Sequence, residues 1–136
     1  MKIIKRVLLV EDDRDDQSLF CESLTELHPG FICEMANDGP HALEMIAQNT
    51  LYDYIFIDLN LPKMDGFQVL ETIKQTTLVQ KVPLIVLSST KRQSDIDRCY
   101  ELGATSFFSK PSSFTELVDV MREAFGEPLA PQEVFH

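Results

Sequence analysis

Basic residues are scarce in this sequence. It has 12 lysines and arginines against 22 aspartates and glutamates, which gives a formal net charge of −10 at pH 7. A surface of this sign repels nucleic-acid phosphates and anionic lipid headgroups. Direct binding to nucleic acid or to a membrane surface is therefore disfavoured.

Cysteines and long hydrophobic runs are also few. Cys21, Cys33 and Cys99 are odd in number and lack the C-x-x-C spacing, which is typical of reduced thiols in a cytoplasmic protein. The apolar run Val7–Val10 is cut short by Glu11, so it does not fit a signal peptide. No stretch approaches the roughly 20 apolar residues of a membrane span. These absences predict a soluble, cytoplasmic protein.

Short apolar runs alternate with segments of helical periodicity along the chain. The runs predicted as strands lie at residues 6–10, 31–36, 54–57, 84–87 and 105–108. Apolar residues at helical spacing predict helices near residues 20–27, 42–47, 67–73, 96–103 and 114–125. Five strand–helix units in strict alternation predict an α/β fold, with a parallel sheet covered by helices on both faces and right-handed crossovers.

One domain is expected from the length. A chain of 136 residues falls within the usual size of a single domain, and it contains no repeat, linker or low-complexity segment. Gly126 and Pro128 end the last predicted helix. We therefore predict a domain over residues 1–126 and a C-terminal tail over residues 127–136.

Polar side chains follow four of the predicted strands at their carboxyl ends, where an open parallel sheet binds its ligands. Any one of these residues, taken alone, is explained by the exposure of strand ends to water, where polar residues collect. Acids after two strands, together with hydroxyls and a lysine, indicate a site instead. In chain order these residues are Glu11, Asp12 and Asp13, then Asp58, then Ser88, Ser89 and Thr90, and finally Lys110 and Pro111.

The chemistry of this set favours phosphoryl transfer to a carboxylate. Two carboxylates about 4 Å apart repel by roughly 4 kcal/mol at an effective dielectric constant of 20, so crowded acids require a cation. Oxygen ligands at a small site suit Mg²⁺ or Mn²⁺. Asp58 stands where it can attack phosphorus, Lys110 can hold the phosphoryl group and Ser88 can donate a hydrogen bond to it.

Four segments resemble the motifs of response-regulator receiver domains of two-component systems. Asp58–Gly66 is similar to the phosphoacceptor pattern D-x-x-[ML]-P-x-[ML]-[DN]-G, and Gly103–Pro111 to the pattern G-A-x-x-[FY]-x-x-K-P. Val7–Asp13 resembles the acidic first-strand motif, and Pro83–Ser89 the strand that carries the hydroxyl. The resemblance implies a flavodoxin-like doubly wound (βα)5 fold with strand order 2-1-3-4-5.

The resemblance also implies a role for each matching residue of the acidic site. Asp58 matches the phosphorylated aspartate. Glu11 and Asp12 match the metal-binding acid pair, and the backbone carbonyl of Asn60 matches a further metal ligand. Lys110 matches the lysine that pairs with the phosphoryl group.

Other matching residues imply a conformational switch. Ser88 and Phe107 match the hydroxyl and the aromatic ring that move after phosphorylation, and Pro111 matches a proline that follows the lysine through a cis peptide bond. The side chains of Asn60 and Thr90 match positions that modulate the lifetime of the acyl phosphate. The surface of the helix at 96–103, the strand at 105–108 and the helix at 114–125 is then expected to change.

The implied donor is a sensor histidine kinase or a small acyl phosphate. The chain catalyses only its own phosphorylation and dephosphorylation, so it is not an enzyme in the usual sense, and its output passes through a downstream protein partner or a phosphotransfer protein. The segment Asp58–Pro62, with Tyr100, Phe107-Phe108 and Ser113-Phe114, is similar to stand-alone regulators of phytochrome-type kinases. Several of those form dimers, which leaves a homodimer open.

The same residues fit rival functions less well. A flavodoxin-like electron carrier needs a phosphate cradle after the first strand, where Glu11 and Asp12 repel an anionic flavin phosphate. An aspartyl phosphatase has an acid two residues after its nucleophile, but that residue is Asn60 here. A degenerate receiver is disfavoured because no residue type of the site is missing. A phosphorelay intermediate and a piece of a longer regulator remain alternatives.

Two further groups of polar residues are predicted to be structural. Asp13, Asp15 and Asp16 begin a helix, where acids favour its positive end, and of these Asp13 adjoins the metal site. The isolated histidines are expected at the surface; they are His28, His41 and His136.

Overall fold

The computed structural model describes residues 4–49, 51–76 and 81–128. Strands and helices alternate through these residues. The strands are β1 (Arg6–Val10), β2 (Ile32–Ala36), β3 (Tyr54–Asp58), β4 (Leu84–Ser88) and β5 (Ser106–Ser109). The helices are α1 (Arg14–Leu27), α2 (Gly39–Asn49), α3 (Gly66–Gln75), α4 (Gln93–Glu101) and α5 (Phe114–Ala124).

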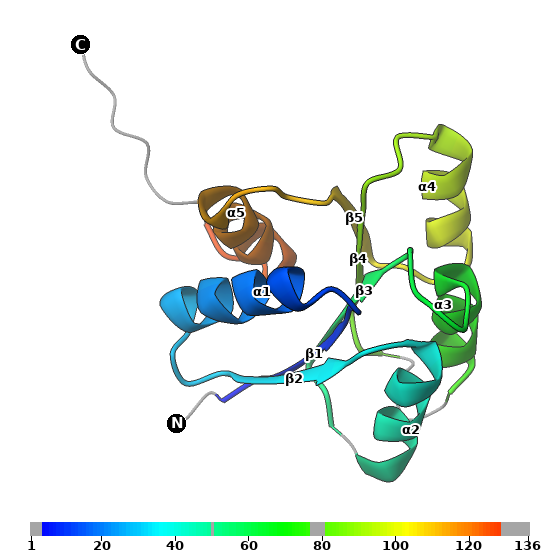
Figure 1. Cartoon of the computed structure of the whole chain (residues 1–136), viewed down its shortest axis with the longest axis horizontal. Coiled ribbons are helices and arrows are strands. Elements are labelled where there is room, and N and C mark those ends of the chain that lie inside the picture. The colour runs from blue at the N-terminus through cyan, green and yellow to red at the C-terminus, as the bar shows by residue number, and fades with distance from the viewer. Residues whose placement is uncertain (1–3, 50, 77–80, 129–136) are drawn as a thin grey trace.

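The five strands form one parallel sheet in the order β2-β1-β3-β4-β5. Helices α1 and α5 cover one face of this sheet, and α2, α3 and α4 cover the other (Figure 1). The fold class and the strand order predicted from the sequence are confirmed.

Side chains of each strand alternate between two hydrophobic cores, because successive strand residues point to opposite faces of the sheet. Leu8, Ile55 and Val86 lie in the core shared with α2, α3 and α4. Phe56 and Ile85 lie in the core shared with α1 and α5. Burial on both faces explains why β1, β3 and β4 are nearly continuous apolar runs rather than alternating patterns.

Helix α3 begins in close contact with the loop that follows β3. Asp65 caps the helix by accepting a hydrogen bond from the Phe67 N–H, and Gln68 completes a capping box. A Cβ atom on Gly66 would lie 2.5 Å from the Cα of Leu59. Only glycine fits there without displacing backbone, so this residue fixes the loop that leads away from Asp58.

Several strand boundaries differ by one residue from those predicted, among them the starts of β2 and β5. The Phe31 N–H donates to the carbonyl of His28 instead of to a neighbouring strand, so β2 begins at Ile32. The Oγ1 of Thr105 accepts from the Leu84 N–H, and β5 begins one residue later. At the start of β2, a turn contact thus takes the place of a sheet contact.

The described histidines are less exposed than predicted, as His28 shows. Its ring is half-buried and stacks on Phe31 with the ring centroids 4.1 Å apart, and its Nε2 lies 2.5 Å from Glu127 Oε2. The contact with Glu127 arises because the chain beyond α5 returns to the end of α1. His41 is also half-buried, and His136 lies outside the described residues.

The three cysteines are free thiols, as predicted. None of the helices in the described ranges is both long enough and apolar enough to cross a membrane.

Candidate active site

The carboxyl ends of the strands bring the predicted polar residues to one edge of the sheet. Val10 is paired with Ile57 in the β1–β3 ladder, so Glu11 and Asp58 follow at neighbouring positions. Ser88 ends β4, and its carbonyl accepts a hydrogen bond from the N–H of Lys110, which follows β5. Four strands therefore contribute to a single cluster.

Three acids of this cluster could share a metal ion. Glu11, Asp12 and Asp58 each offer a carboxylate oxygen, and these oxygens lie within 4.8 Å of one another. The residues Glu11 and Asp58 are each only 4% exposed, whereas Asp12 is exposed. Buried carboxylates this close are unfavourable without a cation, and an all-oxygen set of this size fits Mg²⁺ or Mn²⁺.

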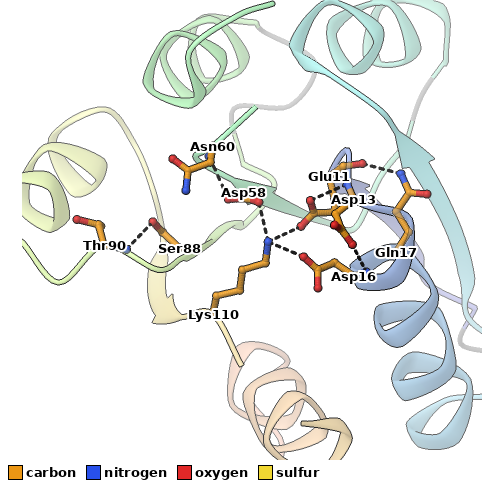
Figure 2. A network of polar contacts seen from close by, with 9 residues as sticks. All are labelled: Glu11, Asp13, Asp16, Gln17, Asp58, Asn60, Ser88, Thr90 and Lys110. Atoms are coloured by element: carbon orange, nitrogen blue, oxygen red, sulfur yellow. Dashed lines mark hydrogen bonds and ion pairs between the residues drawn. The ribbon is translucent and has the colours of Figure 1, made fainter. Parts of the chain in front are cut away.

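The ammonium group of Lys110 contacts two of these acids, Glu11 and Asp58 (Figure 2). Its Nζ is 2.8 Å from Asp58 Oδ2 and 2.9 Å from Glu11 Oε1. A third carboxylate oxygen, Asp16 Oδ2, lies 2.8 Å from the same nitrogen. Burial lowers the pKa of Lys110, but the three carboxylates together outweigh burial and hold the pKa above its ordinary value.

Burial is the main influence on the ionisation of Glu11. Burial raises the pKa of its carboxyl to about 7, the nearby charge of Asp58 adds to the rise, and hydrogen bonds from Lys110 and from the Asp13 N–H oppose it. A group with this pKa is only partly ionised near neutral pH. The pair of buried acids is therefore poised to gain from a cation.

The hydroxyl groups of Ser88 and Thr90 are held by local hydrogen bonds. The Ser88 Oγ is buried and accepts from the Thr90 N–H at 3.1 Å, and the Thr90 hydroxyl donates to Asp95 Oδ2 at 2.9 Å. No hydrogen bond joins Ser88 to Asp58 in the part of the chain that the structure describes. Ser88 is thus beside the acidic cluster but engaged with its own loop (Figure 2).

The backbone N–H groups of Asn60 and Phe107 both donate hydrogen bonds to side chains. The Asn60 N–H donates to Asp58 Oδ1 at 3.0 Å, which orients the carboxylate. The Phe107 ring is half-buried against the core under α3 and α4, and its N–H donates to the Tyr100 hydroxyl at 3.1 Å. Phe108 packs against the opposite core.

The predicted cis peptide bond before Pro111 was wrong, because the described residues contain no cis peptide bond. An X–Pro bond still favours the trans form by about 0.5–1 kcal/mol. Lys110 reaches Asp58 with the trans bond, so its position does not require the rarer isomer.

Sequence reasoning missed the contact between Asp16 and Lys110. Asp16 was assigned only to the positive end of α1, and its N–H does donate to the Asp13 side chain that caps this helix. Its carboxylate, however, faces the acidic cluster. The sequence signal for this contact was the place of Asp16 in the first turn of α1, the helix that follows the acids after β1.

Residues 7–122 match the family described as "Response regulator receiver domain". The chain belongs to this family. The chain is 31% identical over 124 residues to response regulator Rcp1 of Synechocystis, which covers 87% of the chain and 84% of that protein. It is also 31% identical to sensor histidine kinase RcsC of Salmonella typhimurium, but over only 11% of that protein. The chain therefore spans about a tenth of the length of the RcsC kinases.

Solved structures support the assignment. The phosphorylated cyanobacterial phytochrome response regulator RcpA superposes with a TM-score of 0.81 at 29% identity, covering 89% of this chain and 91% of that one. The Mn²⁺-bound form of Rcp1 gives a TM-score of 0.79 at 28% identity and covers 93% and 99%. The magnesium-bound receiver domain of a Pseudomonas aeruginosa sensor histidine kinase gives 0.76 at 28% and covers 92% and 100%.

The receiver is a phosphoacceptor signalling module and not a conventional enzyme. Its acidic site, formed by Glu11, Asp12 and Asp58, serves Mg²⁺-dependent phosphorylation of an aspartate. Membership of the family implies a histidine kinase as its partner.

Proposed function

We propose that Asp58 is the residue that accepts the phosphoryl group. The observation that carries this assignment is the contact of its buried carboxylate with the Lys110 ammonium at 2.8 Å, inside the cluster of three acids. The Asn60 N–H holds Asp58 Oδ1. The two bonds orient the carboxylate at the open edge of the sheet, where a donor can approach.

Glu11, Asp12 and Asp58, with the backbone carbonyl of Asn60, are proposed to hold Mg²⁺, or Mn²⁺ in its place. The close carboxylate oxygens support this set. When bound, the ion neutralises the charge of the carboxylates and of the incoming phosphoryl oxygens. Lys110 supplies a further positive charge to the phosphoryl group, as a point charge on a flexible stem.

The switch is proposed to begin at Ser88. Its hydroxyl leaves the Thr90 N–H and donates to a phosphoryl oxygen on Asp58, and the Phe107 ring then moves toward the space beside β4. Thr90 and Asn60 line the same groove and are proposed to modulate the lifetime of the acyl phosphate. Coupling of this kind is typically about 1–3 kcal/mol, so phosphorylation biases the surface of α4, β5 and α5.

We further propose that a phytochrome-type histidine kinase in the cytoplasm donates the phosphoryl group, and that a downstream protein reads the switched surface. The likeness to Rcp1 and RcpA supports the class of kinase. A homodimer through the α4 and α5 surface belongs to the same proposal. We also propose a domain over residues 1–126 and a tail over residues 127–136, of which Glu127 contacts His28.

Labelling with a radioactive small acyl phosphate in the presence of Mg²⁺ tests the acceptor. Asp58→Asn should reduce the labelling to background, because the amide cannot form an acyl phosphate. Asp119→Asn removes an exposed acid on α5 and should leave the labelling unchanged. Undiminished labelling of Asp58→Asn would refute the assignment.

A further inference from the structure

The ammonium of Lys110 divides its three N–H groups among three carboxylates. Glu11, Asp12 and Asp58 form the acid trio of the proposed metal site. Two partners of Lys110, Glu11 and Asp58, belong to this trio, and their side chains are only 5% exposed. The third partner, Asp16, lies outside the trio, and its side chain is 39% exposed. Lys110 therefore has one carboxylate that the proposed metal site does not share (Figure 2).

Glu11 and Asp58 cannot pair fully with an ammonium group and a divalent cation at the same time. The two positive charges repel at short range, and in a poorly solvated site the repulsion is not screened. If Lys110 had only these two partners, loading the trio with a cation would leave its ammonium without a carboxylate in a half-buried position. Leaving a buried charge unpaired is costly.

We propose that Asp16 is a positioning residue that retains Lys110 when the acid trio holds its cation, an inference that rests on the proposed function. Asp16 keeps an ion pair with the ammonium, so Glu11 and Asp58 are released to the metal at a smaller cost. The ammonium also stays at the edge of the sheet beside Asp58, where the phosphoryl group arrives.

The placement of Asp16 suits this role. It lies in the first turn of α1, and its N–H is fixed by the Asp13 carboxylate at 2.9 Å. Asp15, in the same turn, is exposed and forms no ion pair with any described residue. Asp15→Asn therefore removes the same charge from the same helix end without touching Lys110, which makes it a matched control.

Calorimetric titration with Mg²⁺ tests the proposal directly. Asp16→Asn should weaken Mg²⁺ binding about fivefold relative to Asp15→Asn, equal to about 1 kcal/mol. Asp16→Glu retains the carboxylate and should recover most of the affinity. In a Lys110→Met background, Asp16→Asn and Asp15→Asn should have the same effect, because no ammonium remains to be retained.

Two results would overturn the inference. One is equal Mg²⁺ affinity of Asp16→Asn and Asp15→Asn in the wild-type background. The other is a larger loss of Mg²⁺ affinity for Asp16→Asn than for Asp15→Asn that persists in the Lys110→Met background. Asp16 would then act through long-range electrostatics or through the stability of the fold, and not through Lys110. Thermal melts of the metal-free variants show whether each one folds.

The same titrations separate this inference from the proposed function. If the wild type binds Mg²⁺ and Asp12→Ala does not, the metal site stands, and a null result for Asp16→Asn removes only the role of Asp16. If the wild type binds no Mg²⁺, the proposed metal site fails, and the role of Asp16 fails with it.

Discussion

The pKa values of individual carboxyl groups near the carboxyl ends of the strands are set by burial and by immediate partners. The pKa of Glu11 rises to about 7 chiefly because its carboxyl is removed from water. The pKa of Asp38, which lies between β2 and α2, is shifted in the opposite direction. Its carboxylate accepts from the His41 N–H at 2.8 Å, and this bond, aided by Lys63 at 3.2 Å, holds its pKa below the ordinary value of 3.8.

Asp38 should contribute pH-dependent stability. A carboxyl whose pKa is lowered by folding stabilises the folded state fully above its unfolded pKa, and this contribution disappears as the pH falls through the folded pKa. Asp38→Asn keeps an acceptor oxygen but removes the charge. It should lower the free energy of unfolding by about 0.5–1 kcal/mol at pH 7 and by much less at pH 3.

Urea unfolding between pH 3 and pH 7 measures this difference. The exposed Asp119→Asn provides the control, and its curve should stay parallel to that of the wild type. A constant offset of Asp38→Asn across the whole range would contradict the role of its charge.

At the scale of the elements, the start of α3 depends on one glycine. Gly66→Ala would place its Cβ 2.6 Å from the backbone carbonyl oxygen of Leu59, so either α3 or the loop after β3 must move. Overpacking of this kind typically costs about 1–3 kcal/mol. Gly66→Ala should therefore lower the unfolding midpoint in urea and weaken Mg²⁺ binding through the displaced loop.

Gly30→Ala is the matched control for that substitution. No atom lies within 4 Å of the position of its Cβ, so its effect should stay within about 0.5 kcal/mol. Similar losses in the two variants would show that close packing is not what Gly66 provides.

Most elements could be predicted from the sequence because their signals are local. Apolar runs that stop at an acid or a hydroxyl defined where β1, β3 and β4 end, and the alternation of elements defined the parallel sheet. Glu11, Asp58 and Lys110 then meet because parallel strands end at one edge. Contacts between side chains of different elements could not be predicted in this way.

Asp16 and His28 illustrate that limit. Each residue contacts a group that is distant in the sequence, Lys110 for Asp16 and Glu127 for His28, and no periodicity encodes such a pair. The peptide bond before Pro111 shows a different limit, since a motif carries the identity of a residue but not the isomer of its bond.

At the scale of the whole molecule, the site joins strands that serve both cores. β1 and β3 each send alternate side chains to the α1–α5 face and to the face under α2, α3 and α4. A ligand that ties their ends together should therefore stabilise the entire domain and not one layer of it.

Mg²⁺ should raise the melting temperature of the wild type. At a concentration about 100 times the dissociation constant, binding adds about 2.7 kcal/mol, which corresponds to roughly 8–10 °C for a domain of this size. Asp12→Ala should show a much smaller rise, because a carboxylate of the acid trio is lost. A monovalent salt at equal ionic strength controls for screening, and equal shifts of the two proteins would count against the site.

The bond between the Tyr100 hydroxyl and the Phe107 N–H has a consequence for self-association. β5 is an outer strand of the sheet, and a free amide on such a strand can recruit a strand from another molecule. The phenol occupies that donor, so an incoming chain must first expel a side chain already bonded there. This bond therefore blocks one amide of β5 against strand pairing with another molecule.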